Sequence, residues 1–223
     1  MKMLKKGGNY GKYHWKNEKT VTTLNAYIED TVEIGENVKI YPNVYLIGKT
    51  KIGNGTVVYP NTTIENSVIG ENCEIKSSFI ENSEIKNNVH VGPFAHIRPN
   101  STISDDCKIG NFVEIKASTL GRGTKASHLA YVGDADVGEN CNIGCGAIFV
   151  NYNGKSKSRT TVGDNCFIGS NCNVVAPVNI AKNSYICAGT TITVDTESDD
   201  FVIGRCRETI KKNRANKYLK EMR

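Results

Sequence analysis

One apolar residue recurs at every sixth position along most of this chain, and this period limits the possible folds more than any other feature. The first aliphatic run is strict: Ile28, Ile34, Ile40, Leu46, Ile52, Val58 and Ile64. After slips near Ile69 and Ile80, the period continues through later runs: Val91, Ile97, Ile103, Ile109 and Ile115; Val132, Val137 and Ile143; Val162, Ile168, Val174, Ile180, Ile186 and Ile192. A six-residue period fits neither a helix nor a simple alternating strand. It is typical of a hexapeptide parallel β-helix, an all-β solenoid.

Each hexapeptide is expected to supply one short strand and one corner. The aliphatic residue points inward, and the next residue, often Gly, is expected to turn the corner: Gly35, Gly53, Gly70, Gly110, Gly138, Gly163 and Gly169. Three hexapeptides close a triangular coil, and about nine coils stack at the inter-strand spacing of ~4.8 Å. No coil can bury its own aliphatic face, so the prism must be stabilised by stacking.

The sequence predicts one repeat domain, residues 20–204, between two basic ends. Residues 1–19 carry a net charge of +5 and residues 205–223 a net charge of +6, which leaves −6 for the domain. We expect the first to be a solvated extension and the second a basic tail with a short helix. A nucleic-acid partner is not expected, because only residues 10–15 combine basic and aromatic side chains.

Five of the eight cysteines occupy the small inward position of the repeat: Cys73, Cys107, Cys141, Cys166 and Cys172. They are expected to act as small hydrophobic residues of the core. No CxxC pair occurs and the four histidines do not converge, so no metal site is expected. We find no signal-peptide pattern and no membrane span, which predicts a protein of the reducing cytoplasm.

The period breaks once over a long stretch, between Phe149 and Val162. Residues 151–161 are polar and basic, and they are too numerous for a corner. We therefore expect them to leave the prism as a protruding loop. Such a loop either carries function or is a tolerated insertion, and spacing alone favours neither.

Polar residues cluster near this loop in a way that a plain solenoid does not require. Arg98 and Lys116 are separated by exactly one coil of three hexapeptides, so they should stack on one another. Two adjacent cations without a paired acid indicate an anion site, with phosphate as the natural ligand; the alternative is two solvated cations. His128 lies midway in the sequence between Glu114 and Asn142, so all three could share one edge. A lone histidine, however, is more often structural than catalytic.

Six segments of this region resemble the acetyltransferase domain of the bacterial bifunctional N-acetylglucosamine-1-phosphate uridyltransferase/glucosamine-1-phosphate acetyltransferase: 92–99, 110–116, 128–135, 142–144, 151–154 and 175–178. The resemblance covers residues ~20–206 and includes loop and corner residues that the repeat does not dictate. It implies a left-handed winding, which is the exception to the usual crossover rule. It also implies a homotrimer with active sites between neighbouring chains.

The resemblance implies acetyl transfer from acetyl-CoA to the amine of glucosamine 1-phosphate, by direct attack and without a metal. His128 would be the general base, since an imidazole titrates near the working pH. The residues implied for the acceptor are Arg98, Lys116, Lys157, Tyr131 and Asn142, with Glu114 orienting the site. Those implied for the coenzyme are Asn151 and Tyr152 at the thioester, then Cys145, Ser170, Ala188 and Arg205.

Two departures from the family matter. No uridyltransferase half precedes the repeats, so we expect the product to be released for a separate enzyme. Cys145 stands where the family usually has Ala beside the coenzyme. Two alternatives stay open: an acetyltransferase for another amino sugar or a nucleotide-linked amino sugar, and a non-catalytic solenoid scaffold.

Overall fold

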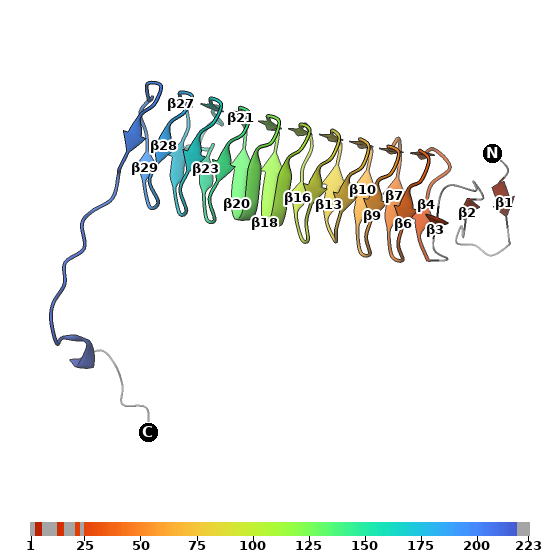
Figure 1. Cartoon of the computed structure of the whole chain (residues 1–223), viewed down its shortest axis with the longest axis horizontal. Helices are drawn as coiled ribbons and strands as arrows, with labels where there is room; N and C mark the ends of the chain where they lie inside the picture. Colours follow the sequence, from red (N-terminus) through yellow and green to blue (C-terminus); the bar gives the residue numbers. More distant parts are fainter. Residues whose placement is uncertain (1–2, 6–12, 16–20, 23–24, 218–223) are drawn as a thin grey trace.

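The computed structural model describes residues 3–5, 13–15, 21–22 and 25–217. These residues form a left-handed parallel β-helix, drawn as a long prism in Figure 1. The predicted all-β solenoid is confirmed. Strands β1 (Met3–Lys5) and β2 (Tyr13–Trp15) form an antiparallel pair outside its faces. The domain limits at residues 20 and 204 stay a prediction.

Three strands and three corners make each coil, so the prism has three faces of parallel strands. The first face consists of β3 (Val21–Thr22), β6 (Lys39–Ile40), β9 (Val57–Val58), β12 (Glu74–Ile75), β15 (His90–Val91), β18 (Lys108–Lys116), β20 (Lys125–Gly133), β22 (Asn142–Ile143), β25 (Phe167–Ile168), β28 (Tyr185–Ile186) and β30 (Phe201–Val202). The second face consists of β4 (Tyr27–Ile28), β7 (Tyr45–Ile47), β10 (Thr63–Glu65), β13 (Phe79–Glu81), β16 (His96–Ile97), the later parts of β18 and β20, β23 (Ile148–Val150), β26 (Asn173–Val175) and β29 (Thr191–Ile192).

The third face is a nine-stranded parallel sheet, in agreement with the expected number of about nine coils. Its strands are β5 (Glu33–Ile34), β8 (Lys51–Ile52), β11 (Val68–Ile69), β14 (Glu84–Ile85), β17 (Thr102–Ile103), β19 (Thr119–Leu120), β21 (Ala135–Val137), β24 (Thr160–Val162) and β27 (Val178–Ile180). We call the edge between the first and second faces the first corner, and the edge between the second and third faces the second corner.

The inward aliphatic residues stack on one another along each face and form a single core. Ile64 and Ile80, for example, are paired in register and fully buried, although their coil is shorter than three full hexapeptides. The five predicted inward cysteines are buried as well. The period therefore identified the core correctly, and the slips in the sequence are shortened coils.

The seven glycines predicted to turn the corners do not have a left-handed backbone. The left-handed residue mostly lies three positions after the inward aliphatic. It is most often an asparagine, such as Asn72 after Ile69 with φ 54°, and elsewhere a glycine, such as Gly55 after Ile52 with φ 69°. Asn tolerates this region better than other non-glycine residues. The corner glycines instead permit close stacking of coils, since a Cβ on Gly110 would overlap the carbonyl oxygen of Ser127.

Beyond β30 the chain leaves the prism as an extended tail with exposed side chains (Figure 1). Within the described residues, the expected helical tail is limited to one 3-10 turn, Ala215–Lys217. None of the described residues form a helix of the length and apolar character needed to cross a membrane.

Candidate active site

Strands β18 and β20 position most of the predicted site residues. Each runs for nine residues around the first corner without interruption, from the first face to the second. Their parallel pairing places His128 over Asn111 and Tyr131 over Glu114. The two strands thus connect the first corner to the second corner within two adjacent coils.

His128 lies exposed at the first corner and has one hydrogen-bond partner among the described residues, Asn111. Its Nδ1 lies 2.7 Å from Oδ1 of Asn111. An amide oxygen only accepts hydrogen bonds, so Nδ1 carries the proton in the neutral ring and Nε2 keeps its lone pair. The sequence reasoning missed Asn111, although its position one coil before His128 could have identified it.

Among the described residues, His128 makes no hydrogen bond with Glu114 or Asn142, which lie on either side of its corner. Glu114 faces outward on the second face and binds Arg98. Asn142 belongs to β22 on the first face, level with Lys125 of the preceding coil. His128 therefore lies at the corner between them.

The pairing of Ile97 with Ile115 places Arg98 and Lys116 next to each other on neighbouring coils, as the spacing predicts. The prediction that these cations lack a paired acid was wrong. Nη1 of Arg98 lies 2.8 Å from Oε1 of Glu114, and this hydrogen bond raises the pKa of Arg98. Nζ of Lys116 lies 3.1 Å from both carboxylate oxygens of Asp134. An anion at this corner must therefore compete with two internal carboxylates.

Lys116 and Asp134 form the less exposed of these two pairs, with side chains 18% and 17% exposed. Burial alone would raise the pKa of Asp134, but the hydrogen bonds from Lys116 and Asn151 and the charge of Lys157 hold it below its ordinary value of 3.8. Asp134 is consequently a carboxylate at neutral pH. Nothing in the sequence reasoning identified this residue.

The Tyr131 side chain lies against Gly133 and reaches the same group of residues. A Cβ on Gly133 would overlap the Tyr131 hydroxyl oxygen and its Cζ, so only glycine leaves room for the ring here. Nδ2 of Asn151 donates to the Tyr131 hydroxyl at 3.3 Å and also to Asp134. We call these residues the second-corner cluster: Arg98, Glu114, Lys116, Tyr131, Asp134 and Asn151.

The segment after β23 leaves the prism as an ordered loop, as expected. Asn151 at its base is only 9% exposed, whereas Tyr152 and Lys157 are exposed and form an antiparallel bridge. Ser158 N–H donates to the Asn151 carbonyl at 2.8 Å and closes the loop. The Arg159 guanidinium binds Asp136 and the Ala117 carbonyl, which fixes the far end of the loop to the prism.

Three of the predicted coenzyme residues form a column along the first corner. Register pairing places Cys145, Ser170 and Ala188 on the three coils that follow His128, all exposed. Arg205 continues this column, because its Nη1 donates to the Ala188 carbonyl at 2.8 Å. At one coil per ~4.8 Å, Ala188 lies about 14 Å along the prism from His128. We call these residues the first-corner column.

The structure therefore divides the predicted site between two edges. His128 and the first-corner column lie on one edge, whereas the second-corner cluster, Tyr152 and Lys157 lie on the other. The stretch of β20 from His128 to Gly133 crosses the second face, which corresponds to about 16 Å of extended strand.

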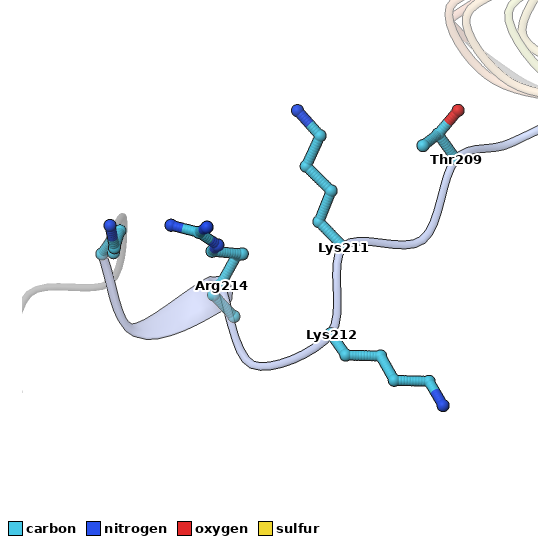
Figure 2. A pocket seen from close by; sticks show the side chains of 6 residues that line it. Thr209, Lys211, Lys212 and Arg214 are labelled. Carbon is cyan, nitrogen blue, oxygen red and sulfur yellow. The ribbon is translucent and has the colours of Figure 1, made fainter.

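The tail contains a separate open hollow of about 770 Å³, lined by Thr209, Lys211, Lys212, Arg214, Ala215 and Lys217. Figure 2 shows Lys211 and Lys212 pointing to different sides of the extended chain. None of the predicted site residues line this hollow, so it is not the candidate active site. In the part of the chain described, no group of three or more His, Cys, Asp or Glu side chains could hold a metal ion; the absence of a metal stays a prediction.

Three family models match successive parts of the chain. These are the GMPPB C-terminal domain over residues 79–151, the bacterial transferase hexapeptide (six repeats) over residues 31–66, and the hexapeptide repeat of succinyl-transferase over residues 159–194. The matches agree with the repeat found in the sequence and with the prism.

Curated relatives confirm the resemblance stated above. The bifunctional protein GlmU of Caldicellulosiruptor saccharolyticus is 54% identical over 196 residues, which is 88% of this chain and 42% of that protein. The bifunctional protein GlmU of Clostridium novyi is 50% identical over 210 residues, 93% of this chain and 46% of that protein. The chain thus spans less than half the length of these relatives.

Among solved structures, LpxA of Bacteroides fragilis, a UDP-N-acetylglucosamine acyltransferase, superposes with a TM-score of 0.56. The sequences are 21% identical, and the match covers 78% of this chain and 67% of that chain. At this identity the likeness supports the β-helix fold alone.

Proposed function

Because this chain is a hexapeptide-repeat protein similar to part of the bifunctional GlmU proteins, we propose that it transfers acetyl from acetyl-CoA to the amine of glucosamine 1-phosphate. The observation that carries the proposal is His128, whose Nδ1 is tied to Asn111 and whose Nε2 keeps its lone pair at the start of the first-corner column. A base next to a coenzyme path is what direct amine acylation requires.

In the proposed reaction the acceptor amine attacks the thioester carbonyl. Nε2 of His128 takes the amine proton, the C–S bond breaks, and the imidazolium returns this proton to the departing thiolate. The products are N-acetylglucosamine 1-phosphate and coenzyme A. Asn151 and Tyr152 are proposed to lie at the thioester, where a backbone N–H stabilises the developing oxyanion. The step needs no metal.

The coenzyme is proposed to extend along the first-corner column from the thioester beside His128. Cys145, Ser170 and Ala188 then line the pantetheine arm, and Arg205 binds a coenzyme phosphate. The thiol of Cys145 is exposed and narrows the column at the first coil after His128.

The acceptor phosphate is proposed to bind Arg98 and Lys116, with Lys157 as a third cation from the loop. Tyr131 and Asn142 contact the sugar, and Glu114 orients Arg98. Both cations already carry an internal carboxylate partner, so the phosphate dianion adds a second anion to each rather than neutralising a free charge.

We further propose that three chains assemble and that each active site combines the first corner of one chain with the second corner of its neighbour. The support is the separation of about 16 Å between the two groups of residues on one chain. A second support is an exposed apolar strip beside His128, made of Phe94, Phe112 and Leu129 on successive coils. All three have positive φ, which costs about 1–2 kcal/mol per residue outside glycine. A cytoplasmic location stays a prediction.

Thiol release from acetyl-CoA tests the proposed activity. Glucosamine 1-phosphate should be the best acceptor, ahead of glucosamine, glucosamine 6-phosphate and a UDP-linked amino sugar. Faster release with the UDP-linked sugar would assign the chain to a different acceptor. Absence of release with every acceptor, in a folded protein, would contradict acetyl transfer.

A further inference from the structure

We propose that Asp134 is a positioning residue of the second-corner cluster, which holds the Lys116 ammonium and both ends of the 151–159 loop in one arrangement. The kinetic part of this inference rests on the proposed acetyl transfer. Its structural part rests only on the contacts of Asp134 described below.

Asp134 contacts Lys116 and both ends of the loop through its carboxylate and its backbone groups. Its carboxylate accepts two hydrogen bonds from Nζ of Lys116, and a third from Nδ2 of Asn151 at the start of the loop. Its carbonyl accepts from the N–H of Thr160, at 3.1 Å, where the loop returns to the prism. Its own N–H donates to the Lys116 carbonyl at 2.9 Å. One residue therefore links the cation, the loop start and the loop end.

These bonds determine which donors remain for a ligand. Two N–H groups of the Lys116 ammonium point to Asp134, so one remains. Both amide N–H groups of Asn151 are used, by Asp134 and by the Tyr131 hydroxyl oxygen. The described residues supply no acceptor for the Tyr131 O–H. Asp134 thus leaves one Lys116 N–H and the Tyr131 O–H as donors for substrate oxygens.

The negative charge of Asp134 is essential to this arrangement. Lys116 binds Asp134 directly, the charge of Lys157 also acts on Asp134, and the charge of Asp134 contributes to the raised pKa of Arg159, so three cations surround one carboxylate. Without that charge, Lys116 would be repelled by its neighbours and would lose two charge-assisted hydrogen bonds. An asparagine at this position keeps the shape but presents N–H groups to other donors.

The test is Asp134→Asn, measured in the whole chain. We expect the KM for glucosamine 1-phosphate to rise roughly ten-fold or more, since charge-assisted bonds are lost. The KM for acetyl-CoA should rise much less, because Asp134 reaches the coenzyme only through Asn151 at the thioester, whereas the first-corner column binds the rest of it. A merely structural role would change both. Equal changes in the two KM values would overturn the proposal.

Asp106→Asn is the matched control. Asp106 is also a left-handed corner residue, with φ 61° against 50° for Asp134. It likewise accepts from a cation and an asparagine, Arg122 at 2.8 Å and Asn88 at 3.2 Å. It contacts neither Lys116 nor the loop, so its replacement should leave both KM values unchanged.

A double-mutant cycle tests whether Asp134 acts through Lys116. In a Lys116→Met background, Asp134→Asn should raise the acceptor KM much less than it does in the parent. The same rise in both backgrounds would mean that Asp134 acts independently of Lys116, and would overturn this part of the inference.

Trypsin cleavage gives a readout that does not need the proposed activity. Asp134→Asn should speed cleavage after Lys155, Lys157 and Arg159, located by mass spectrometry, while Asp106→Asn should not. If Asp134→Asn does not fold, Asn151→Ala removes the amide bonds from the loop to the Asp134 carboxylate and to the Tyr131 hydroxyl, and it should also speed cleavage. Parent-like cleavage in the folded variant would overturn the loop role. An inactive parent with accelerated cleavage in the variant would contradict the proposed function alone.

Discussion

At the scale of single residues, His128 depends on a neighbour outside its own repeat. Asn111, one coil earlier, binds Nδ1 of the imidazole and leaves Nε2 for the proposed proton transfer. The ring itself is exposed, so packing contributes little to its orientation. The side-chain amide of Asn111 therefore sets the orientation that the proposed base His128 needs.

We expect His128→Asn to lower turnover by roughly 10²–10⁴ with little change in either KM, because only the proton acceptor is lost. Asn111→Ala should lower turnover less, since the imidazole remains but loses its orientation. Rapid-quench single-turnover measurements separate these effects from product release. Activity of His128→Asn within a few-fold of the parent would mean that another group or water takes the proton.

Gly133→Ala should displace the Tyr131 ring, because the added Cβ would overlap its hydroxyl and Cζ. The backbone at residue 133 is not left-handed and the ring is able to rotate away, so the melting temperature should change little. The acceptor KM should rise about ten-fold, as for the loss of one hydrogen bond to a charged group. In a Tyr131→Ala background, the same change should have almost no effect. A further ten-fold rise there would show that Gly133 acts on something else.

At the scale of elements, the proposed coenzyme and acceptor surfaces lie at the two corners that one strand pair connects. Strand β20 carries the proposed base His128 at the first corner, and strands β18 and β20 reach the cation cluster at the second corner. Because the β-helix is rigid, a change at one corner should not propagate across the face to the other. The two substrates should therefore respond separately to mutation.

Arg98→Ala should weaken glucosamine 1-phosphate by about ten- to a hundred-fold and leave acetyl-CoA nearly unchanged, since one charge-assisted contact is removed. Arg205→Ala should show the reverse selectivity. Initial-rate kinetics with each substrate varied in turn provide the comparison. If both variants weakened both substrates equally, the division of the site between two corners would be wrong.

The strands, corners and ion pairs also show how much of the structure could be predicted from the sequence alone. The six-residue period predicted the strands and the core because each inward aliphatic residue repeats one buried environment. It misassigned the corner glycines, because close approach of coils and left-handed turns both favour glycine. The carboxylate partners were missed for a different reason: Asp134 follows Lys116 by a full coil of three hexapeptides, whereas Glu114 follows Arg98 by less than that. Because the separation between partners varies from coil to coil, ion pairs can be assigned only when the register of the coils in the folded structure is known.

At the scale of the whole molecule, the exposed strip of Phe94, Phe112 and Leu129 is the feature that most supports the proposed assembly. The two Phe rings stack with centroids 5.7 Å apart, and all three side chains are more than half exposed. Most other left-handed corner residues are asparagines. A single prism has no use for strained, exposed aromatic residues, so their benefit should lie in contacts between chains.

Phe112→Asn tests this benefit. Asn tolerates the left-handed region, so the isolated prism should gain about 1 kcal/mol or lose nothing. The trimer should nevertheless dissociate at micromolar concentration, with loss of acetyl transfer, as measured by analytical ultracentrifugation. Val68→Ser, an exposed apolar residue on the third face, serves as the control and should remain assembled. A trimeric, fully active Phe112→Asn protein would contradict the proposed interface.

The loop base has a consequence for how such chains can diverge. Ile148, just before the loop, and Asn173, on the coil that follows it, are still paired in parallel register, so the core continues as if no residues had been inserted. The stacking of the coils therefore does not depend on how many residues the loop has between its two anchoring points. Doubling the loop would cost only about 0.6 kcal/mol in closure entropy. The length of the loop can thus vary during evolution or engineering without displacing any coil. A longer loop would reach farther from the prism, toward larger acceptors.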